Sequence, residues 1–242
     1  MTFHVAITYY NRPGMLHDLL CDIERERGDH EVRVHVYDDH STSHINTDDL
    51  AHINKLVRFN THGGKQKYYR SIQTALQDAH ANPCDYIIFM QDDNRLATSF
   101  FDRASSTWDA VRHMDPSAAC MNLWLDVQRM NEAVWTNTHR VLCEASTGPV
   151  WRTQWTEPTF ITDKTFFDTL GMIPNVNPSR WNANPALSSG VGTYISTRLH
   201  AKGYSIYQVA DSLLYHGDHE SLMNPIARKS RSLTSKWWPG KR

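Results

Sequence analysis

The sequence predicts an α/β fold built on a largely parallel, doubly wound sheet. Across the first 123 of its 242 residues, apolar runs typical of buried strands alternate with segments whose apolar residues recur at helical spacing. Two of these apolar runs end in paired aspartates, Asp38-Asp39 and Asp92-Asp93. Beyond residue 124, short runs rich in Thr, Val and Trp alternate with turn residues. We therefore expect a smaller antiparallel region in the second half of the same domain.

The strands and helices of the parallel part follow from the apolar pattern. Five apolar runs have the length and the boundaries of strands, and they cover residues 3–8, 31–37, 56–59, 85–90 and 118–123. Three helices are expected between them, beginning at Pro13, after Gly63-Gly64 and near Thr98. Strands joined by helices pair in parallel, because the crossover helix returns the chain to the same end of the sheet.

The second half mixes short elements with one long loop. We expect antiparallel hairpins, two helices and two late strands there, over 131–155, 163–170, 189–202, 204–209 and 212–215 respectively. The Pro- and Asn-rich stretch from 174 to 185 predicts a long loop. Loops of that length in a compact domain are usually lids or binding loops.

Composition limits the class of protein. The formal net charge is −1, which does not indicate attraction of the whole molecule to nucleic acid or to anionic membranes. The last stretch, 221–242, has six basic and no acidic residues, and we expect a solvated terminal tail. No apolar run is long enough to span a membrane, and the four widely spaced cysteines are expected to be reduced and packed. These features predict a cytoplasmic protein.

The most informative segment is DYIIFMQDDN, from Asp85 to Asn94. An uninterrupted apolar strand runs into two adjacent carboxylates, Asp92 and Asp93, at its carboxyl end. Open α/β sheets place their ligand crevice at that end of the strands. Adjacent carboxylates are costly there unless a positive group neutralises them, and a divalent metal is the usual partner. Turn or helix-cap residues are the structural alternative for both aspartate pairs.

Four motifs follow one another along the chain: TYYNR at 8–12, DDHS at 38–41, QDDN at 91–94 and YHGD at 215–218. In this order they resemble the family-2-like nucleotide-sugar glycosyltransferases of the GT-A fold. The resemblance covers residues 3–115 and two late segments, RLHAKGYSI and SLLYHG, whereas 124–190 match only loosely. It implies a hexosyl- or pentosyltransferase that uses a nucleotide sugar, which we expect to be UDP-linked, and Mn²⁺ or Mg²⁺.

The resemblance also implies a division of the chain and roles for its residues. Residues 1–123 would be the Rossmann-like half that binds the nucleotide sugar, 124–220 the acceptor half, and 221–242 a basic tail. The residues that match the family's donor-binding positions are Thr8 and Tyr10 for the nucleoside, Asp39 for the base, commonly uracil, Asp92 for the ribose, Asp93 for the metal, and His216 for the metal or a phosphate.

Two basic residues are further candidates for contacts with the donor phosphates. Lys65 follows two glycines, but the spacing is not that of a Walker loop, and a solvated lysine at a helix start is an equal alternative. Arg12 lies before Pro13 and has the same two interpretations.

The family pattern breaks at the general base. Inverting members carry a carboxylate where this chain reads NPALSSGVG, from Asn184 to Gly192, with no acidic residue. Either Asp163 or Asp126 serves as the base that deprotonates the acceptor hydroxyl, or the enzyme retains configuration and the leaving phosphate takes the proton. Trp181 and Ser189 are our candidates for acceptor contacts.

The acceptor itself stays open. A glycan is the commonest acceptor for this fold. A hydroxymethylated pyrimidine in DNA, the substrate of soluble bacteriophage enzymes in the host cytoplasm, is suggested by the small size and by the basic tail with Trp237-Trp238. The near-neutral net charge argues against duplex binding. A nucleotidyltransferase and an inactive binder of sugar nucleotides are the remaining alternatives.

Overall fold

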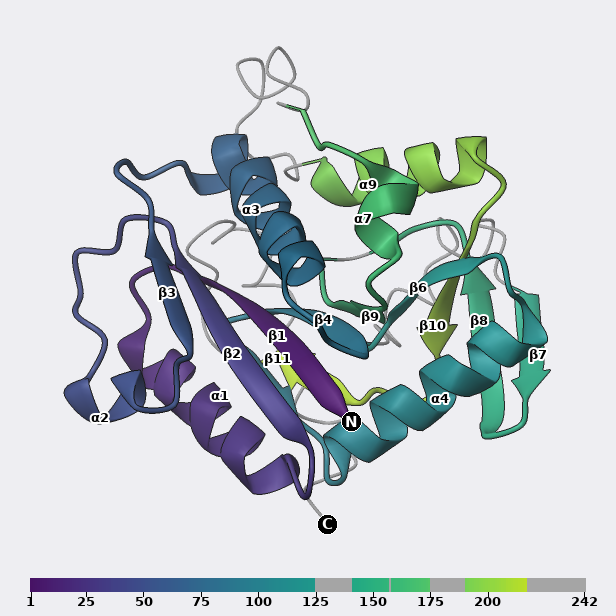
Figure 1. Cartoon of the computed structure of the whole chain (residues 1–242), viewed down its shortest axis with the longest axis horizontal. Coiled ribbons are helices and arrows are strands. Elements are labelled where there is room, and N and C mark those ends of the chain that lie inside the picture. The colour runs from purple at the N-terminus through teal and green to yellow at the C-terminus, as the bar shows by residue number, and fades with distance from the viewer. Residues whose placement is uncertain (125–140, 157, 175–189, 217–242) are drawn as a thin grey trace, which may run out of the picture.

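The computed structural model describes residues 1–124, 141–156, 158–174 and 190–216 (Figure 1). Within these residues the chain forms a nine-stranded sheet of order β3-β2-β1-β4-β9-β6-β10-β8-β7 and a two-stranded sheet of β11 and β5. The strands of the large sheet are β1 (Thr2–Tyr9), β2 (Glu31–Asp38), β3 (Lys55–Arg58), β4 (Tyr86–Gln91), β6 (Ala118–Asn122), β7 (Val141–Ala145), β8 (Gly148–Thr153), β9 (Phe160–Thr162) and β10 (Ser205–Val209).

The first four strands of the large sheet confirm the predicted parallel arrangement. Strand β1 pairs in parallel with both β2 and β4, and β2 pairs in parallel with β3. The register sets Thr8 opposite Gln91, and Tyr9 opposite Asp38. The carboxyl ends of β1, β2 and β4 therefore meet at one edge of the sheet.

The second half adds antiparallel strands to this sheet. Strand β9 runs antiparallel between β4 and β6, whereas β10 is parallel to β6. Strands β7 and β8 form the expected hairpin beyond β10, over 141–153, and residues 131–140 lie outside the described part. Strand β9 was not expected, because three residues are too few to show a periodic pattern.

Helices cover both faces of the large sheet, as a doubly wound fold requires (Figure 1). Helices α1 and α4 lie on one face, and α3, α7 and α9 lie on the other. The helices described are α1 (Pro13–Glu26), α2 (Thr47–Leu50), the 3₁₀ turn η1 (Gly64–Lys67), α3 (Tyr68–Ala81), α4 (Phe100–Met114), α7 (Phe166–Leu170) and α9 (Val191–Ala201). Neither α2 nor η1 was predicted.

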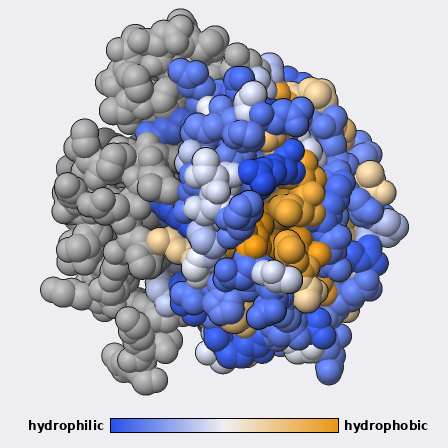
Figure 2. Space-filling model, turned by 90° about the vertical axis from the view of Figure 1, so that its left-hand side faces the viewer, coloured by the Kyte–Doolittle hydropathy of each residue, from blue (hydrophilic) through white to orange (hydrophobic). Residues whose placement is uncertain are grey.

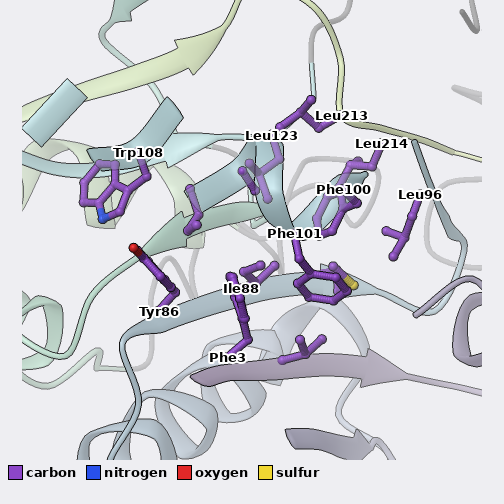
Figure 3. Close-up of a cluster of buried hydrophobic side chains, with 14 of the residues drawn as sticks. Phe3, Tyr86, Ile88, Leu96, Phe100, Phe101, Trp108, Leu123, Leu213 and Leu214 are labelled. Carbon is purple, nitrogen blue, oxygen red and sulfur yellow. The ribbon is translucent and has the colours of Figure 1, made fainter. Parts of the chain in front are cut away.

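Each face of the sheet has its own core. Under α1 and α4, Phe3 packs edge-on against Phe101 with 4.9 Å between ring centroids, and Ile88 and Trp108 belong to the same cluster (Figure 3). On the α3 face, Phe89 of β4 packs against Phe160 of β9 at 4.8 Å. Burying a large apolar side chain stabilises the fold by about 1.5–3 kcal/mol. These contacts fix β4 between its neighbours and so fix the position of the aspartates that follow it.

The small sheet joins the end of the described chain to the segment after β4. Strand β5 (Asn94–Leu96) pairs antiparallel with β11 (Leu214–His216), and the register sets His216 opposite Asn94. Arg95 attaches this sheet to α1 through two hydrogen bonds to the buried Asp22, of 2.6 and 2.8 Å. The backbone of His216 therefore lies beside the acidic end of β4. This last strand was predicted at residues 212–215, and the structure places it at Leu214–His216.

One side of the molecule has a hydrophobic area on its surface. Figure 2 shows the side on which β3 forms the edge of the sheet; it is mostly hydrophilic with one compact hydrophobic area. The large apolar side chains exposed on α2 and β3 are Leu50 and Leu56.

All four cysteines are free, and Cys21, which was expected to pack in the core, lies on the exposed side of α1. No helix in the described ranges has the length and apolar character needed to cross a bilayer.

Candidate functional site

Polar groups from three strand ends meet at the carboxyl edge of the parallel strands. Asp92 joins two of these ends, because its backbone N–H donates to the carbonyl of Thr8 at 3.0 Å and its Oδ2 accepts the backbone N–H of Tyr10 at 3.1 Å. The side chain is buried, with the residue 6% exposed. Three of the residues predicted to bind the donor are thus brought together.

The negative charge of Asp93 is neutralised by another side chain of the protein, that of Arg12. Arg12 Nη1 donates to Asp93 Oδ2 at 3.0 Å and lies 3.6 Å from Asp92 Oδ1. The side chain of Asp93 is 2% exposed and that of Arg12 is 12% exposed. Arg12, which was a candidate for phosphate binding, here supplies the positive charge that two adjacent buried carboxylates need.

Asp39 organises the loop that precedes η1. Its carboxylate accepts the backbone N–H of Gly63 at 2.9 and 3.1 Å, the backbone N–H of Gly64 at 2.7 Å, and Arg70 Nη2 at 2.9 Å. His62 Nδ1 is 3.0 Å from Asp39 Oδ2 and 3.1 Å from the Asp39 carbonyl oxygen. Arg70 was not predicted as a site residue. Its contact with Asp39 exists only because the first turn of α3 lies near the end of β2.

An aromatic pair stands next to Asp39. The rings of Tyr10 and His62 are stacked, with 4.1 Å between centroids and 21° between planes. Tyr10 was predicted for the nucleoside position, but His62 was not. The only signal in the sequence was its place before two glycines, which allow a tight loop.

Two further side chains lie at this edge of the sheet. Tyr68, the first residue of α3, is 7% exposed, and its hydroxyl has no hydrogen-bond partner among the described residues. Burial raises its pKa, the nearby polar side chains of Thr8 and Gln91 lower it in part, and the charges of Asp93 and Asp92 raise it again. Lys65 in η1 is partly buried, which lowers its pKa. A buried hydroxyl without a partner marks a place where a ligand oxygen can be bound.

The residues at the end of β4 fit a divalent cation that is shared with a ligand. Carboxylate oxygens are the ligands that Mn²⁺ and Mg²⁺ prefer, and Asp93 and Asp92 offer them side by side. Within the described ranges there is no group of three acidic, His or Cys side chains that could hold a metal without help. His216 is placed beside Asn94 by its backbone. The donor set therefore suits an ion that takes its other ligands from water and a diphosphate.

One candidate for the general base does not reach the site. Asp163 follows β9, whose register sets Thr162 opposite Ile87, so that it lies at the edge of the sheet away from Asp92. There its carboxylate accepts the N–H and hydroxyl of Thr165 at the start of α7. Asp126, Trp181 and Ser189 lie outside the described residues.

The arrangement can be compared with known proteins. No family model and no curated protein matches the chain by sequence. Solved structures do match, and the chain spans between 36% and 61% of their length. TarS from S. aureus, residues 1–349, is 16% identical over 91% of this chain and 61% of its own, with a TM-score of 0.57. The longer TarS structure is 15% identical over 89% of this chain and 36% of its own, with a TM-score of 0.56.

A second neighbour is GalNAc-T7, solved with UDP, GalNAc and Mn²⁺. It is 14% identical over 99% of this chain and 48% of its own, with a TM-score of 0.58. TarS and GalNAc-T7 are both glycosyltransferases of GT-A type. Identities this low carry information about the fold alone, and the sheet order and helix layers agree with that fold. The chain therefore has the fold of the GT-A glycosyltransferases.

Proposed function

We propose that the chain is a glycosyltransferase that moves a sugar from a UDP-linked donor to an acceptor hydroxyl with the help of Mn²⁺ or Mg²⁺. The observation that carries this proposal is the buried pair Asp92-Asp93 at the carboxyl end of β4, facing the ends of β1 and β2 on a GT-A fold. The neighbour GalNAc-T7, whose structure contains UDP and Mn²⁺, supports the same donor and the same ion.

The ends of β1 and β2 would bind the nucleoside. Tyr10 offers an aromatic face for the base, and Asp39 offers acceptors for a ring N–H such as that of uracil. Asp92 is bound to the backbone of Tyr10, so a ribose on its carboxylate would be held next to the base. Residues 1–123 would thus form the donor-binding half and 124–220 the acceptor half.

The end of β4 would manage the charge of the diphosphate. Asp93 and His216 would hold the cation, which, when bound, neutralises negative charge that grows on the leaving nucleotide. Arg12 lies 3.0 Å from Asp93, within reach of a phosphate oxygen beside it. Lys65 at the start of η1 would bind the diphosphate from the α3 side.

The acceptor side is a proposal of lower detail. Asp163 is no longer a candidate base because of its position at the other edge of the sheet. Asp126 as the base of an inverting enzyme, and proton transfer to the leaving phosphate in a retaining one, are distinguished by the anomeric configuration of the product in an NMR spectrum. We propose a carbohydrate hydroxyl as acceptor, with Trp181 and Ser189 as its contacts; no described residue favours modified DNA.

Calorimetric binding of UDP tests the donor half directly. We expect binding with Mn²⁺ that is weakened by EDTA and weakened about tenfold or more by Asp93→Asn, because the carboxylate is the main ligand. Asp168→Asn, at an exposed carboxylate on α7, is the matched control and should bind UDP as the wild type does. A wild-type protein that binds no UDP with either ion would overturn the proposal. Release of UDP from a panel of UDP-sugars would then identify the sugar.

A further inference from the structure

We infer that the imidazole of His62 occupies the nucleobase position of the proposed donor site, and that a uracil-type base binds by displacing it. This inference rests on the proposed function, since it takes Tyr10 and Asp39 as the groups that receive the base. In the described structure both groups are already engaged by the same ring. The stack on Tyr10 and the approach to Asp39 are the two contacts that a planar base would make there.

The first argument is that the acceptor capacity of Asp39 is full. A carboxylate offers about four lone-pair positions. Three donors, Gly63, Gly64 and Arg70, bind its two oxygens, with the Gly63 N–H shared between them, and His62 Nδ1 approaches one of those oxygens as the fourth. An incoming ring N–H must therefore take the place of one of these donors.

The second argument is that no base fits between the two rings. Stacked rings contact at about 3.5–4 Å, so a ring inserted between two others needs about 7 Å between the outer centroids. The centroids of Tyr10 and His62 are 4.1 Å apart. A base that stacks on this face of Tyr10 therefore replaces the imidazole.

The third argument identifies His62 as the donor that can leave. The N–H groups of Gly63 and Gly64 belong to the backbone of the loop. Arg70 is held by the ring of Phe59, 4.0 Å from its guanidinium carbon, and by the carbonyl of Thr61. The His62 side chain, in contrast, is 46% exposed and can rotate into solvent without breaking the other contacts of Asp39.

The exchange is selective for the chemistry of the base. His62 Nδ1 bonds to the Asp39 carbonyl and lies beside its carboxylate, so the replacing group must be an N–H donor. Uracil, thymine and guanine carry a ring N–H on their pairing edge, whereas cytosine and adenine carry an acceptor nitrogen there and donate only from an exocyclic amine. A base of the second group that donates its amine to Asp39 sets the lone pair of its ring nitrogen near the Asp39 oxygens, so it displaces the imidazole less readily than uracil does.

Titration with uridine in the absence of metal isolates this step from the diphosphate. We expect His62→Ala to bind uridine roughly three- to tenfold more tightly than the wild type, because the site is no longer occupied by its own side chain. Free imidazole should compete with uridine in His62→Ala. Cytidine should bind weakly to both proteins. His52→Ala, which removes an exposed histidine 3.9 Å from Glu24, is the matched control and should leave uridine affinity unchanged.

A second measurement uses the wild type alone. Proton contacts between the His62 and Tyr10 rings should be present in the NMR spectrum of the nucleotide-free protein and lost when uridine binds. Unchanged or weaker uridine binding by His62→Ala, or ring contacts that persist with uridine, would overturn the inference while UDP binding by the wild type upholds the proposed function. If the wild type binds neither uridine nor UDP, both fail together.

Discussion

Charge compensation at single residues stabilises the acidic end of β4. Asp92 and Asp93 are 6% and 4% exposed, and burying two adjacent carboxylates is unfavourable without a cation. Arg12 fulfils that need from the end of β1, in a position next to the carboxylate assigned to the metal. Under the proposed function, the guanidinium and a divalent ion would be alternative partners of Asp93.

Removing Arg12 should make the protein depend on metal for stability. Breaking a buried ion pair from one side costs about 3–5 kcal/mol, so Arg12→Gln should unfold at lower temperature in EDTA. Mn²⁺ should recover more of that loss than it adds to the wild type, which thermal-shift measurements with EDTA and with Mn²⁺ would detect. The control is Arg27→Gln, at an exposed pair with Glu24. Equal metal-induced shifts in Arg12→Gln and wild type would contradict this prediction.

The hydroxyl of Tyr68 should matter for the ligand and not for the fold. Because it has no partner among the described residues, Tyr68→Phe should leave the free energy of unfolding within about 0.5 kcal/mol of the wild type. The affinity for UDP should fall severalfold, as expected for the loss of one hydrogen bond worth about 0.5–1.5 kcal/mol. Urea denaturation and calorimetry measure the two quantities. A variant that is clearly less stable but binds UDP normally would show that the hydroxyl is structural.

Sequence reasoning found some of these residues and missed others for a physical reason. Asp92 and Asp93 were found because the end of a strand can be read from its apolar run, and Tyr10 was found through the family resemblance. His62 and Arg70 come from a loop and a helix start whose direction is set by the hydrogen bonds to Asp39. Those bonds depend on tertiary packing, which periodicity does not encode.

At the scale of elements, the long periodic segments and some short ones, such as β3, β11 and α7, were predicted near their observed positions, whereas α2, η1, β5 and β9 were not. The helix over Pro13–Glu26 and the strand over Tyr86–Gln91 agree with the expected positions. Strands β5 and β9 have three residues each, so they have no period to detect and exist only through pairing with their neighbours. The turn η1 before α3 was likewise not predicted, because the loop that leads into it is held by hydrogen bonds to Asp39.

That loop should tolerate no side chain at Gly63. A Cβ there would lie 2.5 Å from Lys67 Cβ and 3.2 Å from the Asp39 carboxylate, so Gly63→Ala must shift η1 away from β2. We expect lower stability, by about 1–3 kcal/mol, and weaker binding of uridine. Gly14→Ala is the matched control, because a Cβ in α1 meets nothing within 4 Å and alanine favours helices by about 0.5–1 kcal/mol. Denaturation curves that rank the two variants in the opposite order would refute this account of the loop.

At the scale of the whole molecule, stability should depend on two buried histidines. The rings of His4 and His35 lie 4.2 Å apart between β1 and β2, and His4 has no hydrogen-bond partner among the described residues. Burial lowers the pKa of both, and that of His4 to about 3. Since the unfolded chain protonates histidine below its ordinary pKa of 6.5, folding stability is fully present above that pH and is lost as the pH falls from about 6.5 toward 3.

Replacing His4 should remove much of this dependence. Between pH 7 and pH 5, His4 lowers the wild-type free energy of unfolding by about 2 kcal/mol. The His4→Phe variant lacks this loss, so its free energy of unfolding should decrease over the same pH interval by about 2 kcal/mol less than that of the wild type. Urea denaturation at the two pH values gives both numbers. The other histidines, including His17, whose pKa is raised by Asp49, are common to both proteins and cancel in the comparison. Parallel pH profiles would contradict the assignment.

The pairing of strands could be predicted only in the part of the chain where strands and helices alternate. Alternating strands and helices predict parallel pairing, and β1 to β4 do pair in parallel, but their order β3-β2-β1-β4 was not predicted. The second half breaks this order, because β9 enters the sheet between β4 and β6 from a later part of the chain. No local pattern in residues 158–174 indicates which strands they join.

The position of β9 has a consequence for the synthesis of the protein on the ribosome. Phe89 of β4 pairs with Phe160 of β9. The edge of β4 that faces β9 therefore stays unpaired after β4 leaves the ribosome, until β9 has been translated as well. Exposed strand edges favour association between nascent chains, and pairing across such a long separation is slow. The pairing of the strand that ends in Asp92 and Asp93 is therefore completed only after residue 162 has left the exit tunnel.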